Sequence, residues 1–183
     1  MQTQSAAMAR VPAGLCEERT YMDGRTTLAA IRFDDIDALN EAASEDFGPF
    51  GEPVHVSQEM IDAYADLIDD RQWIHIDVER CRRESPFGGT VAHGFLTLSL
   101  LPPLMRTVPS YDIRGHSAGV NYGAELLRFL SPVPAGSDIA ARSRIVRAEP
   151  HKFGTLLTSE AAIHVVGAEK PSVVYRMQVL YRG

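Results

Sequence analysis

The pattern of hydrophobic and polar residues changes character once along the chain. In residues 57–70, apolar side chains recur at helical spacing behind Ser57, a good N-cap, which predicts a helix that ends near Asp69 and Asp70. Residues 91–101 are apolar on nearly every side and predict a buried helix. From His116 onward the period becomes two, most cleanly in residues 173–182, which predicts antiparallel strands. Helices followed by strands predict an α+β domain.

Weaker signals place shorter elements around this frame. Residues 35–44 predict a short helix, residues 54–56 predict a strand, and Asp77 is an N-cap candidate for a helix over 78–83. Acidic side chains are dense before residue 52, and Gly48-Pro49-Phe50-Gly51 marks a turn at the end of this part. We therefore expect an acidic N-terminal extension over residues 1–52 and the main domain over residues 53–183.

Composition narrows the class of protein. The 183 residues carry 18 Lys and Arg against 24 Asp and Glu, a net charge of −6, which argues against a protein that coats nucleic acid. The two cysteines, Cys16 and Cys81, are too few for a disulfide framework. The first ten residues lack the pattern of a signal peptide, and the longest uncharged stretch, residues 91–105, is too short to span a membrane. These features predict a cytoplasmic protein of one domain.

Asp70 and His75 are the first candidates for chemistry. They lie five residues apart, just after a predicted helix end, where a turn can aim both side chains into one pocket. A carboxylate and an imidazole that share a water molecule can act as general base and acid. The spacing alone also fits a structural role, in which Asp70 caps a turn and His75 is a hydrogen-bonded histidine. His75, Asp77 and His93 are metal-ligand types, but their spacing matches no zinc motif, so we predict no metal.

A second candidate is the His93-Gly94 pair before the apolar helix. Backbone N–H groups at a helix start are unpaired and can stabilise a carbonyl oxygen that gains negative charge. Gly94 equally fits close packing, and His93 equally fits a hydrogen-bonded core position. The glycine-rich loop at residues 87–90 lacks a phosphate-binding pattern. Asn121 and Tyr122 precede Gly123 in a predicted strand, where the glycine fits a bulge.

Together these pieces resemble the MaoC-like dehydratase family, which includes (R)-specific enoyl-CoA hydratases. The resemblance lies in YADLIDDRQWIHID at 64–77, SPFGGTVAHGFLT at 85–97, VNYG at 120–123 and RFLSPVPAG at 128–136. It implies a hot-dog fold, in which an antiparallel sheet wraps a long central helix, here about residues 94–105. It also implies a homodimer whose sheets join edge to edge, and no metal or redox cofactor.

The resemblance assigns roles to individual residues. Asp70 and His75 fall on the family's catalytic pair, and Gly94 falls on the residue whose backbone N–H holds the thioester carbonyl. The implied reaction is reversible syn addition of water to a trans-2-enoyl thioester, giving an (R)-3-hydroxyacyl thioester of coenzyme A or a carrier protein. Which of the pair is the base stays open. We further expect substrate contacts from four other residues, His93, Trp73, Asn121 and Tyr122.

Some features depart from the family pattern. Arg71-Gln72-Trp73 replaces the usual Asn-Pro segment, and Asp69 would raise the pKa of Asp70 if both carboxyl groups faced the site. The strand half of the chain offers cations for the phosphates of coenzyme A, although a solvated strand face explains any one of them equally well: Arg142, Arg144, Arg147 and Lys152. The competing functions are a non-catalytic hot-dog subunit that binds acyl thioesters or a partner protein, and a thioesterase.

Overall fold

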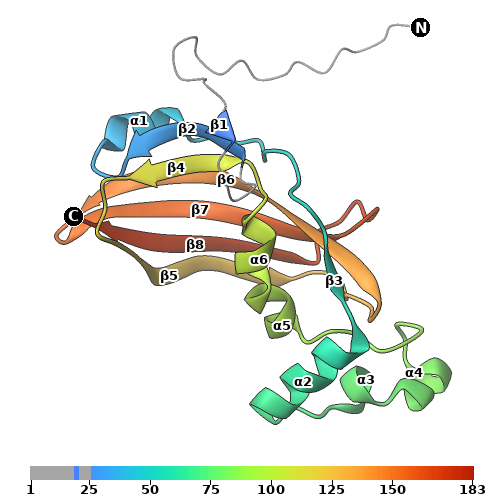
Figure 1. Cartoon of the computed structure of the whole chain (residues 1–183). Coiled ribbons are helices and arrows are strands. Elements are labelled where there is room, and N and C mark those ends of the chain that lie inside the picture. Colours follow the sequence, from blue (N-terminus) through green and yellow to red (C-terminus); the bar gives the residue numbers. More distant parts are fainter. Residues whose placement is uncertain (1–18, 21–25) are drawn as a thin grey trace, which may run out of the picture.

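The computed structural model describes residues 19–20 and 26–183, so the expectations for the first 18 residues, Cys16 included, lie outside the described residues. A curled sheet is accompanied by several short helices (Figure 1). In chain order the elements are β1 (Arg19–Thr20), β2 (Thr26–Arg32), α1 (Ile36–Glu41), β3 (Val54–Val56), α2 (Gln58–Ile68), α3 (Trp73–Ile76), α4 (Val78–Glu84), α5 (Gly94–Ser99), α6 (Leu101–Met105), β4 (Ser110–Arg114), β5 (Ala118–Phe129), β6 (Ser137–His151), β7 (Gly154–Val165) and β8 (Val173–Arg182).

The main sheet has five strands in the order β3-β6-β7-β8-β5, and every pair in it is antiparallel. Because side chains alternate across a strand, one face gathers the apolar positions that the period of two predicted. Ala141 pairs with Ile163, and Ala161 pairs with Tyr175, so these side chains line the same face across three strands. That face carries the larger core of the molecule. The prediction of antiparallel strands is confirmed.

Helices α5 and α6 lie against this core, but they do not form the single helix expected over residues 94–105. The helices meet at Leu100, which is the C-cap of α5 and the N-cap of α6. Pro102 and Pro103 lack the N–H groups that would bond to the carbonyls one turn earlier, so a continuous helix is lost there. Complete burial of this segment is also wrong for this chain, because Phe95 is 59% exposed.

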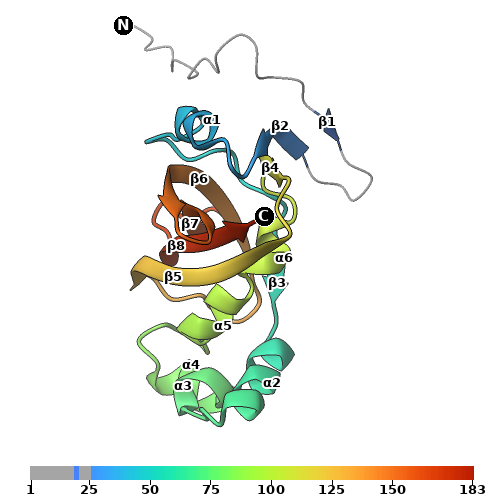
Figure 2. The same cartoon turned by 90° about the vertical axis from the view of Figure 1, so that its left-hand side faces the viewer.

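Helices α2, α3 and α4 form a group at one end of the molecule, beyond α5 (Figures 1 and 2). The predicted caps are confirmed: the Ser57 hydroxyl accepts from the Met60 N–H at 3.2 Å, and the Asp77 carboxylate accepts from the Arg80 N–H at 2.9 Å. Asp69 ends α2 in the left-handed conformation, with φ at 56°. No helix among the described residues has the length and apolar character needed to cross a membrane.

The described part of the N-terminal segment packs against the main sheet. The Asn40 side chain, on α1, exchanges two hydrogen bonds with the backbone of Ala148, at 3.0 and 2.8 Å. Residues 44–51 then follow the edge of β6, to which the N–H groups of Ser44, Gly48 and Gly51 donate. Together with β3 they line that edge, and β5 is the long edge strand on the opposite side of the five-stranded sheet. The domain boundary at residue 52 stays a prediction.

The face of the sheet opposite the main core carries a buried ionic cluster. Glu160, 5% exposed, accepts hydrogen bonds from Arg144 at 2.9 Å and from Arg176 at 2.8 Å. Burial by itself would raise the pKa of Glu160, but the hydrogen bonds from the two arginines outweigh it and hold the pKa below its usual value. The Phe47 ring lies against the guanidinium of Arg144, 5.2 Å from its centre.

Candidate active site

The Asp70 and His75 side chains meet because of how the chain turns after α2. The left-handed Asp69 ends the helix and redirects the backbone, and the short α3 then carries His75. The Asp69 side chain is 94% exposed and 3.6 Å from Arg71, so it points to solvent. The two neighbouring carboxyl groups therefore do not both face the site, and Asp69 does not meet the condition for acting on Asp70. An aspartate tolerates the left-handed conformation better than most residues, which explains its presence here.

Three polar side chains converge at this turn. A carboxylate oxygen of Asp70, a ring nitrogen of His75 and a ring nitrogen of His93 all lie within 4.8 Å of one another. A single water molecule can bridge two such atoms with hydrogen bonds of about 2.8 Å each. Both histidines are buried, with exposed fractions of 8% and 4%. The structure therefore brings the predicted pair together and adds His93 to it.

Hydrogen bonds fix the tautomers of both rings. His75 Nδ1 lies 2.6 Å from the Val91 carbonyl oxygen, and because a carbonyl only accepts, Nδ1 carries the proton. His75 Nε2 therefore has a free lone pair. Burial lowers the pKa of His75 below its usual value of 6.5, although the bond to Val91 and the charge of Asp70 act in the opposite direction. The ring is thus held in the neutral form that can accept a proton.

His93 is packed between the other members of the site. Its ring stacks on His75 with centroids 3.7 Å apart and planes 25° from parallel. Its Nε2 donates to the Asp70 backbone carbonyl at 3.0 Å, and its buried Nδ1 has no hydrogen-bond partner among the described residues. The Tyr64 ring covers another side, at 5.3 Å. His93 thus connects the backbone of Asp70 to the ring of His75.

The same three residues are of types that bind metals, but their arrangement is poorly suited to an ion. The lone pairs of stacked imidazoles lie in two nearly parallel planes, whereas a tetrahedral ion needs its ligands' lone pairs to converge on one point. One nitrogen of each ring is also hydrogen-bonded to a backbone carbonyl and is not free to bind an ion. Asp77, which sequence grouped with His75 and His93, instead caps α4. The geometry therefore favours proton transfer over metal binding.

A polar network that the sequence analysis did not predict holds the backbone of His75 through Gln58 and Thr90. The Gln58 amide N–H group donates to the His75 backbone carbonyl at 2.8 Å, and the Thr90 hydroxyl donates to the Gln58 side-chain oxygen at 2.5 Å. Gln58 thereby ties the start of α2 to both α3 and the loop before α5. No short-range signal reveals such a group, because its partners lie 17 and 32 residues away.

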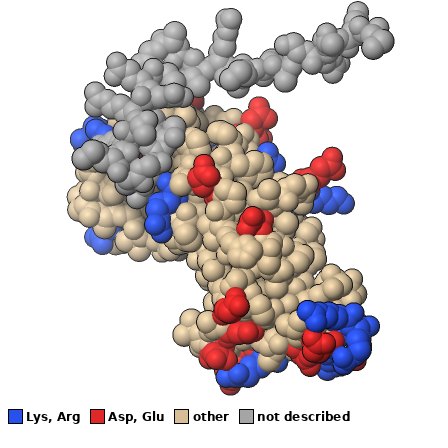
Figure 3. All heavy atoms as spheres, turned by 45° about the vertical axis from the view of Figure 1, so that its right-hand side comes forward, with Lys and Arg blue, Asp and Glu red and all other residues tan. Residues whose placement is uncertain are grey.

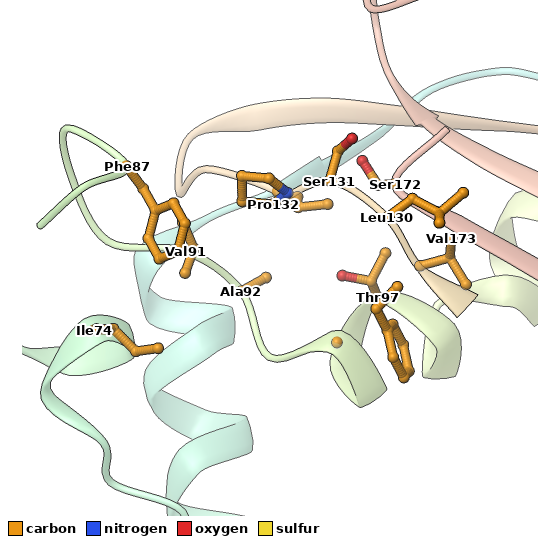
Figure 4. Close-up of a pocket in the computed structure, with 13 residues that line it drawn as sticks. Ile74, Phe87, Val91, Ala92, Thr97, Leu130, Ser131, Pro132, Ser172 and Val173 are labelled. Carbon is orange, nitrogen blue, oxygen red and sulfur yellow. The ribbon is translucent and has the colours of Figure 1, made fainter. Parts of the chain in front are cut away.

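An apolar cavity of about 320 Å³ opens beside this cluster (Figure 4). Ile74 borders it next to His75, and Gly94 borders it at the start of α5. A Cβ at Gly94 would lie 2.8 Å from the Phe129 ring, so only glycine lets the β5 end approach this closely. The other lining residues come from the loop before α5, from α5 itself and from segments next to the end of β5 and the start of β8: Phe87, Val91, Ala92, Thr97, Leu130, Ser131, Pro132, Val133, Ser172 and Val173.

Three residues expected to contact the substrate lie elsewhere in this chain. Trp73 does not line the cavity, and its ring packs under the Arg80 guanidinium at 4.1 Å. Asn121 and Tyr122 lie in the first half of β5, on the exposed part of the strand, far along it from Phe129. Neither Asn121 nor Tyr122 lines the cavity of a single chain, so their contact with the substrate stays a prediction. The apolar residues that do line the cavity carry no chemical signature in sequence.

Comparisons with solved structures define the class of fold. The (R)-hydratase from A. caviae involved in PHA biosynthesis matches with a TM-score of 0.58 at 20% identity, covering 75% of this chain and 97% of that chain. The MaoC-like dehydratase from Rhodospirillum rubrum matches with a TM-score of 0.58 at 22% identity, covering 75% and 92%. These likenesses confirm the predicted α+β hot-dog fold.

Sequence relatives define the family. The family model for the MaoC like domain matches residues 45–165. The 3-hydroxyacyl-thioester dehydratase Z of Mycobacterium tuberculosis is 39% identical over 150 residues, covering 81% of this chain and 97% of that protein. Nodulation protein N of Rhizobium leguminosarum bv. viciae is 40% identical over 121 residues, covering 66% of this chain and 74% of that protein. The chain belongs to the MaoC-like dehydratase family, as the sequence motifs indicated.

Proposed function

We propose that the protein is a hydro-lyase that reversibly adds water to a trans-2-enoyl thioester to give an (R)-3-hydroxyacyl thioester. One observation carries the proposal: Asp70 and His75 place an oxygen and a nitrogen within 4.8 Å of each other beside an apolar cavity. The pair can hold a water molecule, and the cavity can hold an acyl chain. The name of the 39% identical dehydratase relative supports the same class of reaction.

In this proposal His75 starts the hydration as the proton acceptor. Its Nδ1–H is held by Val91, so the free Nε2 takes a proton from the water while the water oxygen bonds to C3 of the substrate. The electron pair of the double bond moves toward the thioester oxygen as an enolate. His75 then returns the proton to C2 on the same face: the enolate's C1–C2 double-bond electrons form the new C2–H bond, and the thioester carbonyl is restored. Asp70 orients the water and stabilises the charged imidazole.

Gly94 is proposed to stabilise the enolate. Its N–H lies in the first turn of α5, where the backbone donors have no acceptor within the helix. Because Gly94 borders the cavity, a thioester oxygen can reach that N–H while the acyl chain lies against the apolar wall. The negative charge that develops there is greatest in the transition state, so this donor accelerates the reaction instead of only binding the substrate.

We further propose that the protein acts as a homodimer joined through β5. This strand is the long edge strand of the sheet, and it carries exposed apolar side chains, including Val120 at 49%, Phe129 at 45% and the adjoining Leu130 at 56%. Phe95 of α5 packs against Phe129 with ring centroids 5.3 Å apart and extends the same surface. Exposed edges that carry apolar groups are stabilised by pairing with another strand.

The test is turnover of an enoyl-CoA panel by Asp70→Asn and His75→Gln, followed by the loss of enoyl-thioester absorbance. Each variant replaces one ionisable partner of the water site by an uncharged amide, so kcat should fall at least about 100-fold. Asp69→Asn is the matched control, because this neighbouring acid points to solvent and should keep normal turnover. Near-normal turnover in either site variant, or no hydration of any enoyl thioester by the unaltered protein, contradicts the proposal.

A further inference from the structure

The hydrogen bonds around Gln58 form a closed ring that includes the side chain of His75. The Gln58 amide N–H group donates to the His75 carbonyl at 2.8 Å, and the amide oxygen accepts from the Thr90 hydroxyl at 2.5 Å. Thr90 is followed along the chain by Val91, whose carbonyl accepts from His75 Nδ1 at 2.6 Å. The ring of bonds thus returns to its start through the His75 backbone. We call these three hydrogen bonds the Gln58 network.

The orientation of the Gln58 amide is determined by its partners. Its nitrogen lies 2.8 Å from the His75 carbonyl and 2.8 Å from a carboxylate oxygen of Asp62, and both oxygens accept hydrogen bonds without donating any. The nitrogen end of the amide therefore faces them, and the amide oxygen is left for the Thr90 hydroxyl. Two donors and one acceptor on a single planar group are all used, so the amide fits this position in one way only.

Burial makes these bonds hard to replace. Thr90 is 6% exposed and His75 is also buried, so water has little access to the groups that Gln58 joins. A buried hydroxyl or carbonyl that loses its partner stays unpaired unless the chain around it moves. Without the Gln58 amide, we therefore expect α3, which carries His75, to shift against the loop that carries Thr90.

That loop is fixed on its other side to the segment after β5. The Ala92 N–H group donates to the Val133 carbonyl at 2.8 Å, and the Ala135 N–H group donates to the Thr90 carbonyl at 3.0 Å. The loop then leads directly to Gly94 and the start of α5. It therefore provides a fixed reference for the cavity wall and the proposed oxyanion donor, and the Gln58 network sets the position of α3 against it.

The ion pairs among the helices do not make this connection. Figure 3 shows basic and acidic side chains mixed together over the end formed by α2, α3 and α4. Three pairs join residues that are close along the chain: Arg71 with Asp66 at 2.8 Å, Arg80 with Glu84 at 2.8 Å, and Arg82 with Glu79 at 2.7 Å. None of these three reaches the loop before α5, and exposed pairs contribute little to stability. The side chain of Gln58, in contrast, bonds to residues 17 and 32 positions away.

We propose that Gln58 and Thr90 are positioning residues, which hold the His75 ring in the tautomer that leaves Nε2 free to accept a proton. The kinetic part of this inference rests on the proposed function. While the Val91 carbonyl lies against Nδ1, the ring proton stays on that nitrogen. Once α3 shifts, a neutral imidazole can carry its proton on either nitrogen, so only part of the molecules keep a lone pair on Nε2.

Steady-state kinetics with crotonyl-CoA test the effect on turnover. Gln58→Met removes the amide at similar length, and Thr90→Val removes the hydroxyl at similar shape. Each should lower kcat about 5- to 10-fold and change KM less than about twofold, because the loop that forms the cavity wall stays in place. Thr90→Ser keeps the hydroxyl and should retain normal kcat. Gln72→Met is the matched control, since this exposed glutamine next to α3 has its side chain outside the Gln58 network.

Nitrogen-15 NMR of the histidine rings supplies a readout that a general loss of structure does not move. It distinguishes a ring nitrogen that carries a proton from one that does not, and it needs no substrate. At about pH 8, where the ring is neutral, His75 of the unaltered protein should show a protonated Nδ1 and a bare Nε2. Gln58→Met and Thr90→Val should shift these signals toward a mixture of tautomers, and Thr90→Ser should not. His75→Gln identifies the signals by their loss.

The outcomes separate this inference from the proposed function. If the unaltered protein hydrates no enoyl thioester, the proposed function is wrong, and the tautomer of His75 in the variants still decides the positioning role. If Gln58→Met and Thr90→Val keep the single tautomer, Gln58 and Thr90 do not position His75, whatever happens to kcat. An equal loss of kcat in Thr90→Ser or in Gln72→Met also overturns the inference, because the loss then does not depend on the Gln58 network.

Discussion

His75 and His93 lie face to face in one buried corner, yet their hydrogen bonds leave opposite nitrogens free. His75 donates through Nδ1 to Val91, and His93 donates through Nε2 to the carbonyl of Asp70. Two rings of the same kind are therefore used differently: His75 keeps a lone pair free for the proposed water site, and His93 holds the backbone that carries the Asp70 carboxylate. The surroundings of each ring, and not its residue type, decide its chemistry.

The pKa of His75 predicts how activity depends on pH. Burial lowers this pKa below 6.5, so the neutral ring persists as the pH falls through the range where an ordinary histidine becomes charged. We expect kcat/KM for enoyl-CoA hydration to stay level on acidification to about pH 6.5 and to decline only below it. A pH profile measured between about pH 5 and 8 checks this. A decline centred above 6.5 would mean that another group controls the acid limb.

Gly94→Ala is predicted to disturb both the wall of the cavity and the proposed oxyanion donor. The added methyl group would lie 2.8 Å from the Phe129 ring, so the ring or the start of α5 must move. Because this donor acts mainly in the transition state, we expect kcat to fall about 10- to 100-fold with little change in overall stability. Steady-state kinetics and thermal unfolding test the two parts separately. Gly88→Ala, at a loop position with open space but a positive φ of 77°, controls for backbone strain alone.

At the scale of residues, the sequence predicted those features that depend on residues close together along the chain. Asp70 and His75 are five residues apart, so one local turn decides whether they meet, and His93 with Gly94 marks a helix start. Gln58, Thr90 and Phe129 escaped prediction because their contacts connect segments that only the complete fold brings together. An apolar residue that lines a cavity also looks in sequence like any other apolar residue.

At the scale of elements, alternation was a better guide than hydrophobic content. The period of two located β7 and β8 closely, because each strand has one face on the core and its partners confirm the register. The apolar segment before them was predicted as one buried helix, whereas two prolines divide it into α5 and α6. Its exposed Phe95 belongs instead to the open surface beside β5, which a single chain leaves uncovered.

The β5 edge provides a test of assembly. Val120→Lys places a charge on the open strand and should weaken the proposed dimer, since charged side chains prevent edge-to-edge pairing. Sedimentation velocity should show a dimer for the unaltered protein and a larger monomer fraction for the variant. Val166→Lys changes a residue that is equally exposed, at 55%, but lies outside β5, and it should leave the dimer intact. A monomer in the unaltered protein, or equal dissociation of both variants, contradicts pairing through β5.

At the scale of the whole molecule, acid should weaken the fold in two stages. Burial lowers the pKa of His75 and His164 below 6.5, so the unfolded chain gains protons first and stability begins to fall below that pH. Glu160 has a pKa below its usual 4.5, so its contribution is complete above 4.5 and is lost as the pH falls further. The ionic cluster thus controls the second stage.

Glu160→Gln tests this cluster. The variant leaves Arg144 and Arg176 without their shared carboxylate, so the free energy of unfolding at pH 7 should drop by about 3 kcal/mol. The difference between variant and unaltered protein should shrink below pH 4.5, where Glu160 itself becomes protonated. Urea unfolding at several pH values measures both effects. Glu169→Gln, on the connection after β7, is the matched control, and an equal loss of stability there would argue against a special role for the cluster.

The covered edge of β6 limits where a second copy of the chain can extend the sheet. Another chain can pair with any edge strand whose backbone N–H and C=O groups are free, and repeated pairing of this kind leads to fibres. Here β3 and residues 44–51 cover the edge of β6, which leaves β5 as the long edge strand of the five-stranded sheet. When two β5 strands pair about a two-fold axis, each uses up the side that the other needs. In the proposed dimer, residues 44–51 therefore shield most of the opposite edge of the sheet from a further copy.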